Sequence, residues 1–180
     1  APVQPDIDCL ARMVELLQKI RDRGMEPVMA GTLPLDHYLD GDGFLEEMEQ
    51  CVRSLKGDDN FRRLFMDAAL ITQLTGIVKE IKELLAREEK QVKEKAGFFS
   101  TVKMETVNGR LVMLRDIAWM AERDVLGNVE KILKLSGAAQ GQGISASSLQ
   151  KYKKINFLCN CLDRLEVRGR DSAGIQMAWV

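Results

Sequence analysis

One long stripe of apolar residues limits what this chain can fold into. Between residues 61 and 85 the apolar positions recur at steps of three and four, which is the period of an α-helix with one buried face. Charged residues such as Lys79 and Glu83 fall outside the stripe, and Asp59 can cap the helix. The pattern therefore predicts one helix that buries Phe61, Leu64, Phe65, Ala68, Ile71, Leu74, Val78, Ile81 and Leu85. We interpret the charged run at 87–95 as a solvated end of this helix.

Four further segments repeat this period, and each ends close to a glycine or a change of composition. Residues 25–34 are interrupted by Pro and Gly, so we expect irregular structure there. The fold class predicted is mainly α, an antiparallel bundle of four to five helices over residues 6–135, with the last helix packed on it or extending away. The helices should span residues 6–23, 44–55, 61–85, 111–137 and 147–165.

The same stripes predict which side chains form the core. Trp119 lies between stripe positions and is expected to be partly exposed. The core should include Leu17, Leu64, Ile71, Ile81, Leu114, Ile117, Val125 and Ile132.

The chain changes character after the fourth helix. Residues 138–146 are rich in Gly, Gln and Ser and are predicted to be a linker between the bundle at 1–137 and a helix–strand unit at 147–180. The run Ala173–Val180 is short and apolar, which favours a single C-terminal strand. No other part of the chain offers a strand to pair with it, and backbone groups need partners. We therefore expect this strand to belong to an incomplete sheet.

Composition excludes several function classes. The 180 residues carry 26 basic and 27 acidic side chains, a net charge of -1, so we expect no nucleic-acid binding. No apolar run reaches the length of a membrane span. The four cysteines are scattered, and Cys159 and Cys161 would point about 200° apart on a helix. Reduced thiols and a first segment without a signal-peptide pattern predict a cytoplasmic location.

Residues 164–174 carry the most specific pattern, Arg-Leu-Glu-Val-Arg-Gly-Arg-Asp-Ser-Ala-Gly. Nine of its eleven positions agree with the Arg-Leu-Glu-Tyr-Arg-Gly-Tyr-Asp-Ser-Ala-Gly signature of class II glutamine amidotransferase domains. The segment resembles above all the glutamine:fructose-6-phosphate aminotransferases, or glucosamine-6-phosphate synthases. Val167 and Arg170 depart from the signature. The resemblance covers about residues 147–180, and residues 1–137 resemble no family.

The resemblance implies a chemistry. In such domains an N-terminal Cys attacks the amide of glutamine, its own α-amine serves as base, and ammonia leaves for a synthase site. The resemblance places Arg168 and Gly169 beside that nucleophile as catalytic residues, and Asp171, Ser172 and Gly174 in the turn before the strand. It implies glutamine and a sugar phosphate as substrates, no cofactor, and two partners: the remainder of the amidotransferase domain, whose sheet would include the strand, and a sugar-phosphate isomerase domain.

The chain also departs from that family. It begins with Ala1 where the family has its nucleophilic Cys, and about 150 residues precede the signature. We expect a helical domain inserted between the nucleophile and the signature, and a chain that has no glutaminase activity by itself. The alternative is a non-catalytic helical interaction or assembly module with a decayed signature. The bundle could assemble as a homo-oligomer in either case.

Two other candidate sites are weaker. A calcium-loop template at residues 36–47 lacks the oxygen ligand at its third position, which is Tyr38, so a turn and an acidic helix N-terminus explain it better. His37 has no second His or suitably spaced Cys for zinc. No metal site is therefore predicted. The template matches only at Asp36, Asp40, Gly41 and Glu47.

Overall fold

The computed structural model describes residues 8–40, 43–139 and 144–166, and within these ranges the chain is mainly helical, as predicted. The strand expected at 173–180 lies outside the described residues, and no strand occurs within them. The helices are α1 (Asp8–Arg21), α2 (Met25–Met29), η1 (Leu35–His37), α3 (Phe44–Ser54), α4 (Asp58–Met66), α5 (Ala68–Lys95), η2 (Ala96–Phe98), α6 (Thr101–Trp119), η3 (Met120–Leu126), α7 (Gly127–Ser136) and α8 (Ala146–Glu166).

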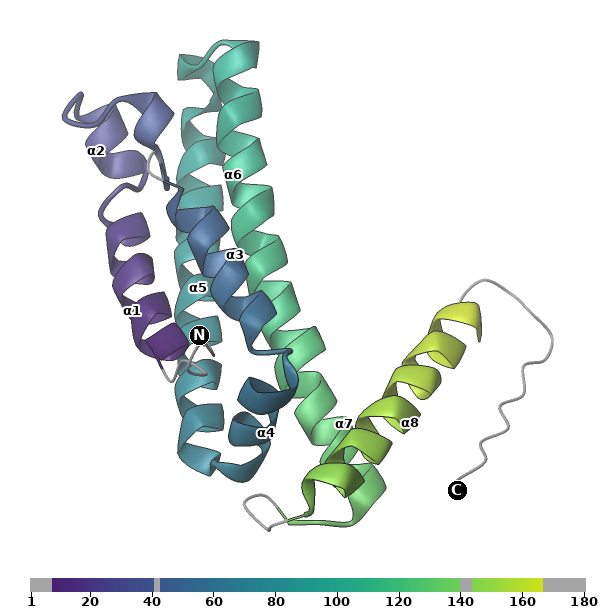
Figure 1. Cartoon of the computed structure of the whole chain (residues 1–180). Helices are drawn as coiled ribbons and strands as arrows, with labels where there is room; N and C mark the ends of the chain where they lie inside the picture. The colour runs from purple at the N-terminus through teal and green to yellow at the C-terminus, as the bar shows by residue number, and fades with distance from the viewer. Residues whose placement is uncertain (1–7, 41–42, 140–143, 167–180) are drawn as a thin grey trace.

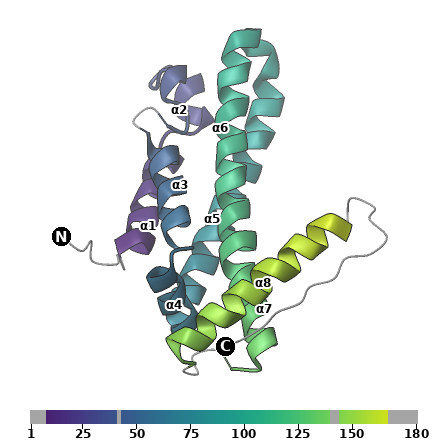
Figure 2. The ribbon, with the colours of Figure 1, turned by 45° about the vertical axis from the view of Figure 1, so that its right-hand side comes forward.

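An antiparallel hairpin of α5 and α6 forms the long axis of the molecule (Figure 1). The pair α1 and α3 packs along this hairpin, with α1 against α5 and α3 against α6. The rod of α6 continues through η3 into α7, and the short α4 lies near its lower end (Figure 2). None of the helices among the described residues is both long and apolar enough to cross a bilayer.

The helix predicted for residues 61–85 is wrong in one respect, because the chain breaks at Asp67. That residue is extended, with φ −122° and ψ 106°, and ends α4. Its carboxylate Oδ1 accepts a hydrogen bond from the amide of Ala69 at 2.8 Å, so Asp67 starts α5 as an N-cap. The break turns the first turn of α5 away from the core, whereas the earlier stripe residues on α4 stay buried. Ala68 is therefore exposed, and Ile71 is only half-buried.

Other boundaries also differ from the prediction. The fourth helix starts at Thr101 rather than near residue 111, and η3 within the same rod is a π-helix. A short helix, α2, occupies part of the segment expected to be irregular. Gly137 ends α7 in the left-handed conformation, with φ 65°, at the predicted position.

The predicted core is confirmed except at Ile71. Trp119, expected to be partly exposed, is 53% exposed. The charged run at 87–95 continues α5 to Lys95, but it is not wholly solvated, because Glu88 is 1% exposed. The predicted core residues that are buried are Leu17, Leu64, Ile81, Leu114, Ile117, Val125 and Ile132.

Candidate functional site

The residues assigned to the amidotransferase signature lie beyond the described part of the chain. Arg168, Gly169, Asp171, Ser172 and Gly174 all fall within 167–180, which the structure does not describe. It does describe the helix that leads to them, since α8 ends at Glu166, the third residue of the signature. The structure therefore bears on this site only through the position of α8, the helix that leads into the signature.

The first half of α8 packs on the base of the bundle. Leu149 is 3% exposed and joins a small apolar cluster with Phe61 and Phe65 of α4 and Val129 and Ile132 of α7. This cluster is separate from the main core. The sequence left open whether the last helix packs on the bundle or extends from it, and α8 does both.

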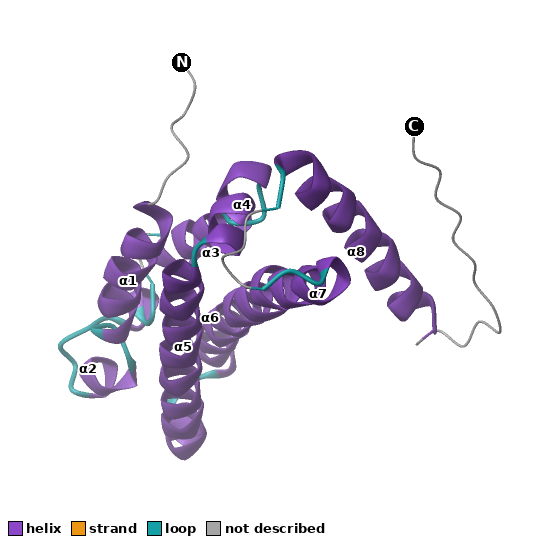
Figure 3. Ribbon diagram, turned by 90° about the horizontal axis from the view of Figure 1, so that it is seen from below, coloured by secondary structure: helices purple, strands orange, loops and turns teal. Residues whose placement is uncertain are grey.

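The second half of α8 diverges from the long rod as an arm (Figure 3), and polar side chains of α7, such as Lys131, which pairs with Asp163 at 3.3 Å, still reach it. Ile155, Leu158, Cys159 and Leu162 are only half-buried there, and Phe157 is 66% exposed. These side chains therefore leave part of the apolar surface of α8 accessible to solvent, and burying that surface would be favourable. The arm thus presents an apolar surface that the described residues leave partly open.

A cavity of about 350 Å³ opens between α4, the η3–α7 segment and α8. Its size is at the lower end of the range of small-molecule sites. Apolar side chains and amide or charged groups share its walls: Lys56, Phe61, Asp124, Asn128, Ile132, Lys153, Asn156, Phe157, Asn160 and Cys161.

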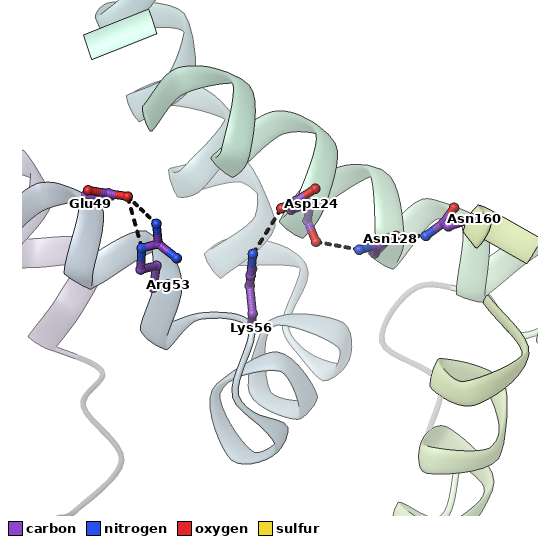
Figure 4. A network of polar contacts seen from close by, with 6 residues as sticks. All are labelled: Glu49, Arg53, Lys56, Asp124, Asn128 and Asn160. Atoms are coloured by element: carbon purple, nitrogen blue, oxygen red, sulfur yellow. Dashed lines mark hydrogen bonds and ion pairs between the residues drawn. The ribbon is translucent and has the colours of Figure 1, made fainter. Parts of the chain in front are cut away.

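Three asparagines connect α7 to α8 at this cavity. Asn128 Oδ1 accepts hydrogen bonds from Asn156 Nδ2 at 2.8 Å and from Asn160 Nδ2 at 3.0 Å. Its own Nδ2 donates to the backbone oxygen of Asp124 at 2.6 Å (Figure 4). Asn156 is 4% exposed, and its Oδ1 has no hydrogen-bond partner among the described residues. Buried side-chain amides normally have hydrogen-bond partners for both their oxygen and their nitrogen. Asn156 Oδ1 is therefore the acceptor in this cluster that still lacks one.

The π-helix η3 supplies one wall of the cavity. A π-helix inserts a residue into the helical repeat and so changes which side chains share a face, and such segments are frequent at functional sites. Asp124 in η3 forms an ion pair with Lys56 at 2.9 Å, which ties the loop before α4 to the rod (Figure 4).

A second lysine holds α8 against α4. Lys153 lies 4.8 Å from the centroid of the Phe61 ring and pairs with Asp58 at the start of α4. The cavity thus offers hydrogen-bond donors, hydrogen-bond acceptors and an aromatic wall, which suit the binding of a small molecule. Its lining residues include one thiol, Cys161, and no histidine that could act as its base.

The residues of the calcium-loop template do not converge. Asp40 Oδ1 accepts the amide of Phe44 at 2.7 Å and so caps α3, whereas Glu47 pairs with Arg12 at 2.6 Å. Gly41 lies outside the described residues. No group of three or more His, Cys, Asp or Glu side chains within the described ranges could hold a metal ion.

Sequence reasoning missed the asparagine cluster. The spacing of Asn156 and Asn160, one helical turn apart, shows that they share a face of α8. Nothing local to the sequence connects them to Asn128, which lies on another helix.

Comparison with known proteins gave no counterpart, since no protein-family model, curated protein or solved structure matches this chain. Its function must therefore be inferred from its own residues.

Proposed function

We propose that this chain is part of a glutamine-dependent amidotransferase, related to the glutamine:fructose-6-phosphate aminotransferases, that supplies ammonia for amino-sugar phosphate synthesis in the cytoplasm. The observation that carries the proposal is the nine-of-eleven agreement at residues 164–174. Helix α8 supports it, because it ends at Glu166 and so gives the signature the preceding helix that the family has.

The surface of α8 also supports the proposal. The half-buried Ile155, Leu158 and Leu162 are suited to a helix that packs on a further element. In this proposal that element is the remainder of the amidotransferase domain. Residues 1–137 are then a helical insertion, 138–146 the connection, and 147–180 the helix–strand fragment of the enzyme.

The proposed chemistry assigns each signature residue a role. The thiolate of an N-terminal Cys attacks the amide carbon of glutamine, and the amide nitrogen leaves as ammonia after protonation. Water then hydrolyses the thioester to glutamate and frees the thiol. Arg168 and Gly169 border that nucleophile, and Asp171, Ser172 and Gly174 hold the turn that follows.

Glutamate release from glutamine tests the proposal. We expect none from the 180-residue chain, because Ala1 cannot supply the thiol, and release from the protein encoded by the whole reading frame. In that protein Arg168→Ala and Gly169→Val should slow release much more than Arg170→Ala, the control at a position that already departs from the family. Release by the 180-residue chain, or a full rate in Gly169→Val, would contradict the assignment.

A second candidate function is a helical assembly module. Val112 and Trp119 are seven residues apart on α6, so they lie on one face, and they are 46% and 53% exposed. Phe98 and Val102, at the tip of the α5–α6 hairpin, are each 73% exposed. Exposed apolar patches are typical of contact surfaces. Light scattering across a concentration series should detect self-association that Trp119→Ser weakens, whereas a monomer at every concentration would argue against this function.

A further inference from the structure

Two of the cysteines lie on the first helix pair, one on each helix. Cys9 lies near the start of α1 and is half-buried, and Cys51 lies in α3 and is 8% exposed. The two helices pack along each other (Figure 1). Cys159 and Cys161 lie on α8, two residues apart, so the helix directs their thiols about 200° apart.

A hydroxyl fixes the Cys9 side chain beside Cys51. Ser54, one turn after Cys51, donates its single hydroxyl hydrogen to the backbone oxygen of Cys51 at 2.7 Å. The 3.0 Å contact between Cys9 Sγ and Ser54 Oγ is therefore a hydrogen bond donated by the Cys9 thiol. The Cys9 thiol also lies close enough to Cys51 to contribute to the raised pKa of the Cys51 thiol.

We propose that Cys9 and Cys51 are a modification site, a dithiol that a small-molecule disulfide such as oxidised glutathione converts into a disulfide between α1 and α3. A disulfide forms without backbone movement only where the two Cα atoms lie within about 7 Å of each other, so the linked peptide sought below also tests this spacing. This inference does not depend on the amidotransferase proposal.

The two thiols have different parts in the reaction. The Cys9 thiolate, on the accessible side, attacks one sulfur of oxidised glutathione, forms a mixed disulfide and releases one glutathione. The Cys51 thiol loses its proton to solvent and attacks the Cys9 sulfur, which forms the protein disulfide and releases the second glutathione. Two protein thiols are oxidised and one glutathione disulfide is reduced to two thiols.

The surroundings of Cys51 set the rate of the second step. Burial, and then the neighbouring Cys9, raises the pKa of the Cys51 thiol to about 11. Burial is the larger cause and persists in the mixed disulfide, whereas the free Cys9 thiol does not, so we expect the Cys51 pKa to stay raised there. Only the thiolate attacks, so the second step should become faster as the pH rises toward that pKa. The mixed disulfide on Cys9 should therefore be detectable at neutral pH.

The test incubates the 180-residue chain with oxidised glutathione, quenches it by acid and alkylation, and maps disulfides by mass spectrometry. We expect the chain to lose two hydrogen atoms and to yield a Cys9–Cys51 linked peptide that dithiothreitol removes. Cys51→Ser should accumulate glutathione on Cys9, and Cys9→Ser should react slowly at Cys51. The double variant Cys159→Ser/Cys161→Ser is the control and should form the linked peptide normally.

Thermal unfolding supplies a second readout. The oxidised chain and the oxidised control variant should melt about 5–15 °C higher than their reduced forms, because the bond closes a long loop in the unfolded chain. Cys9→Ser should show no such shift. A stable glutathione adduct on Cys9 of the unmodified sequence at pH 9, with no Cys9–Cys51 peptide, would overturn the proposal. Linkage of Cys9 to Cys159 or Cys161 would overturn it as well.

Discussion

The buried carboxylate of Glu88 accepts a hydrogen bond from the backbone amide of Met25 at 2.7 Å. Glu88 lies in the last third of α5, whereas Met25 is the first residue of α2, so this bond satisfies a free amide at the start of a helix. Arg87 pairs with the other carboxylate oxygen at 3.2 Å. Burial, and then the charge of Glu88, raises the pKa of the Tyr38 hydroxyl well above its usual range.

Removing this carboxylate should destabilise the chain. We expect Glu88→Ala to lower the free energy of unfolding by about 2–4 kcal/mol, because the buried amide of Met25 loses its acceptor. Glu83→Ala, an exposed position on the same helix, is the control and should change it by less than about 0.5 kcal/mol. Urea unfolding followed by circular dichroism measures both. Equal effects in the two variants would mean that Glu88 does not hold α2.

Gly24 has no space for a side chain beside Glu88. A Cβ at Gly24 would lie 2.6 Å from Glu88 Oε1, so Gly24→Ala should destabilise the bundle and loosen α2. Gly76 in α5 is the matched control, since a Cβ there meets nothing within 4 Å. Gly76→Ala should raise stability by about 0.5–1 kcal/mol through helix propensity. A gain of stability in both variants would show that the carboxylate simply moves aside.

Core truncations should separate Leu114 from Ile71. Leu114 is fully buried, so Leu114→Ala should cost about 2–5 kcal/mol. Ile71 is half-buried after the break at Asp67, so Ile71→Ala should cost about 1–2 kcal/mol. Equilibrium unfolding of the two variants measures the difference. A larger loss at Ile71 would mean that α4 and α5 form one continuous helix in solution.

The ion pair of Arg12 and Glu47 predicts a pH dependence. Hydrogen bonds from Arg12, 2.6 and 2.8 Å long, lower the pKa of Glu47 below its usual 4.5. A lowered pKa in the folded state gives stability that is present above pH 4.5 and lost as the pH falls through the folded-state pKa. Glu47→Gln should therefore be less stable than the unmodified sequence at pH 6, and the gap should be smaller at pH 3. Thermal unfolding at the two pH values checks this, and a constant gap would exclude the pair as its cause.

The asparagine cluster should hold the base of α8. Asn128→Ala removes the acceptor of two amides and should cost about 1–3 kcal/mol. Hydrogen exchange should increase in α8 more than in α1. Asn108→Ala on the exposed side of α6 is the control and should leave α8 protected. Unchanged exchange of α8 in Asn128→Ala would show that the remaining contacts, those of Leu149, Lys131 and Lys153, are enough to hold the helix.

The sequence by itself determined the mainly helical class and most of the core. Helical period is a local property, so the burial of Ile81, Leu114 and Val125 and the end of α7 at Gly137 followed from spacing. The candidate signature was likewise recognised from residues 164–174 alone.

Only the tertiary structure decided which distant residues meet. The break at Asp67 is a local exception: its side chain caps a helix start two residues away, and the apolar stripe concealed that cap. The burial of Glu88 depends on the amide of Met25, 63 residues earlier. Two further hydrogen bonds also join separate helices, one between Cys9 and Ser54 and one between Asn128 and Asn156. Such pairings depend on how helices pack on one another, and the periodicity of one helix does not specify its partner.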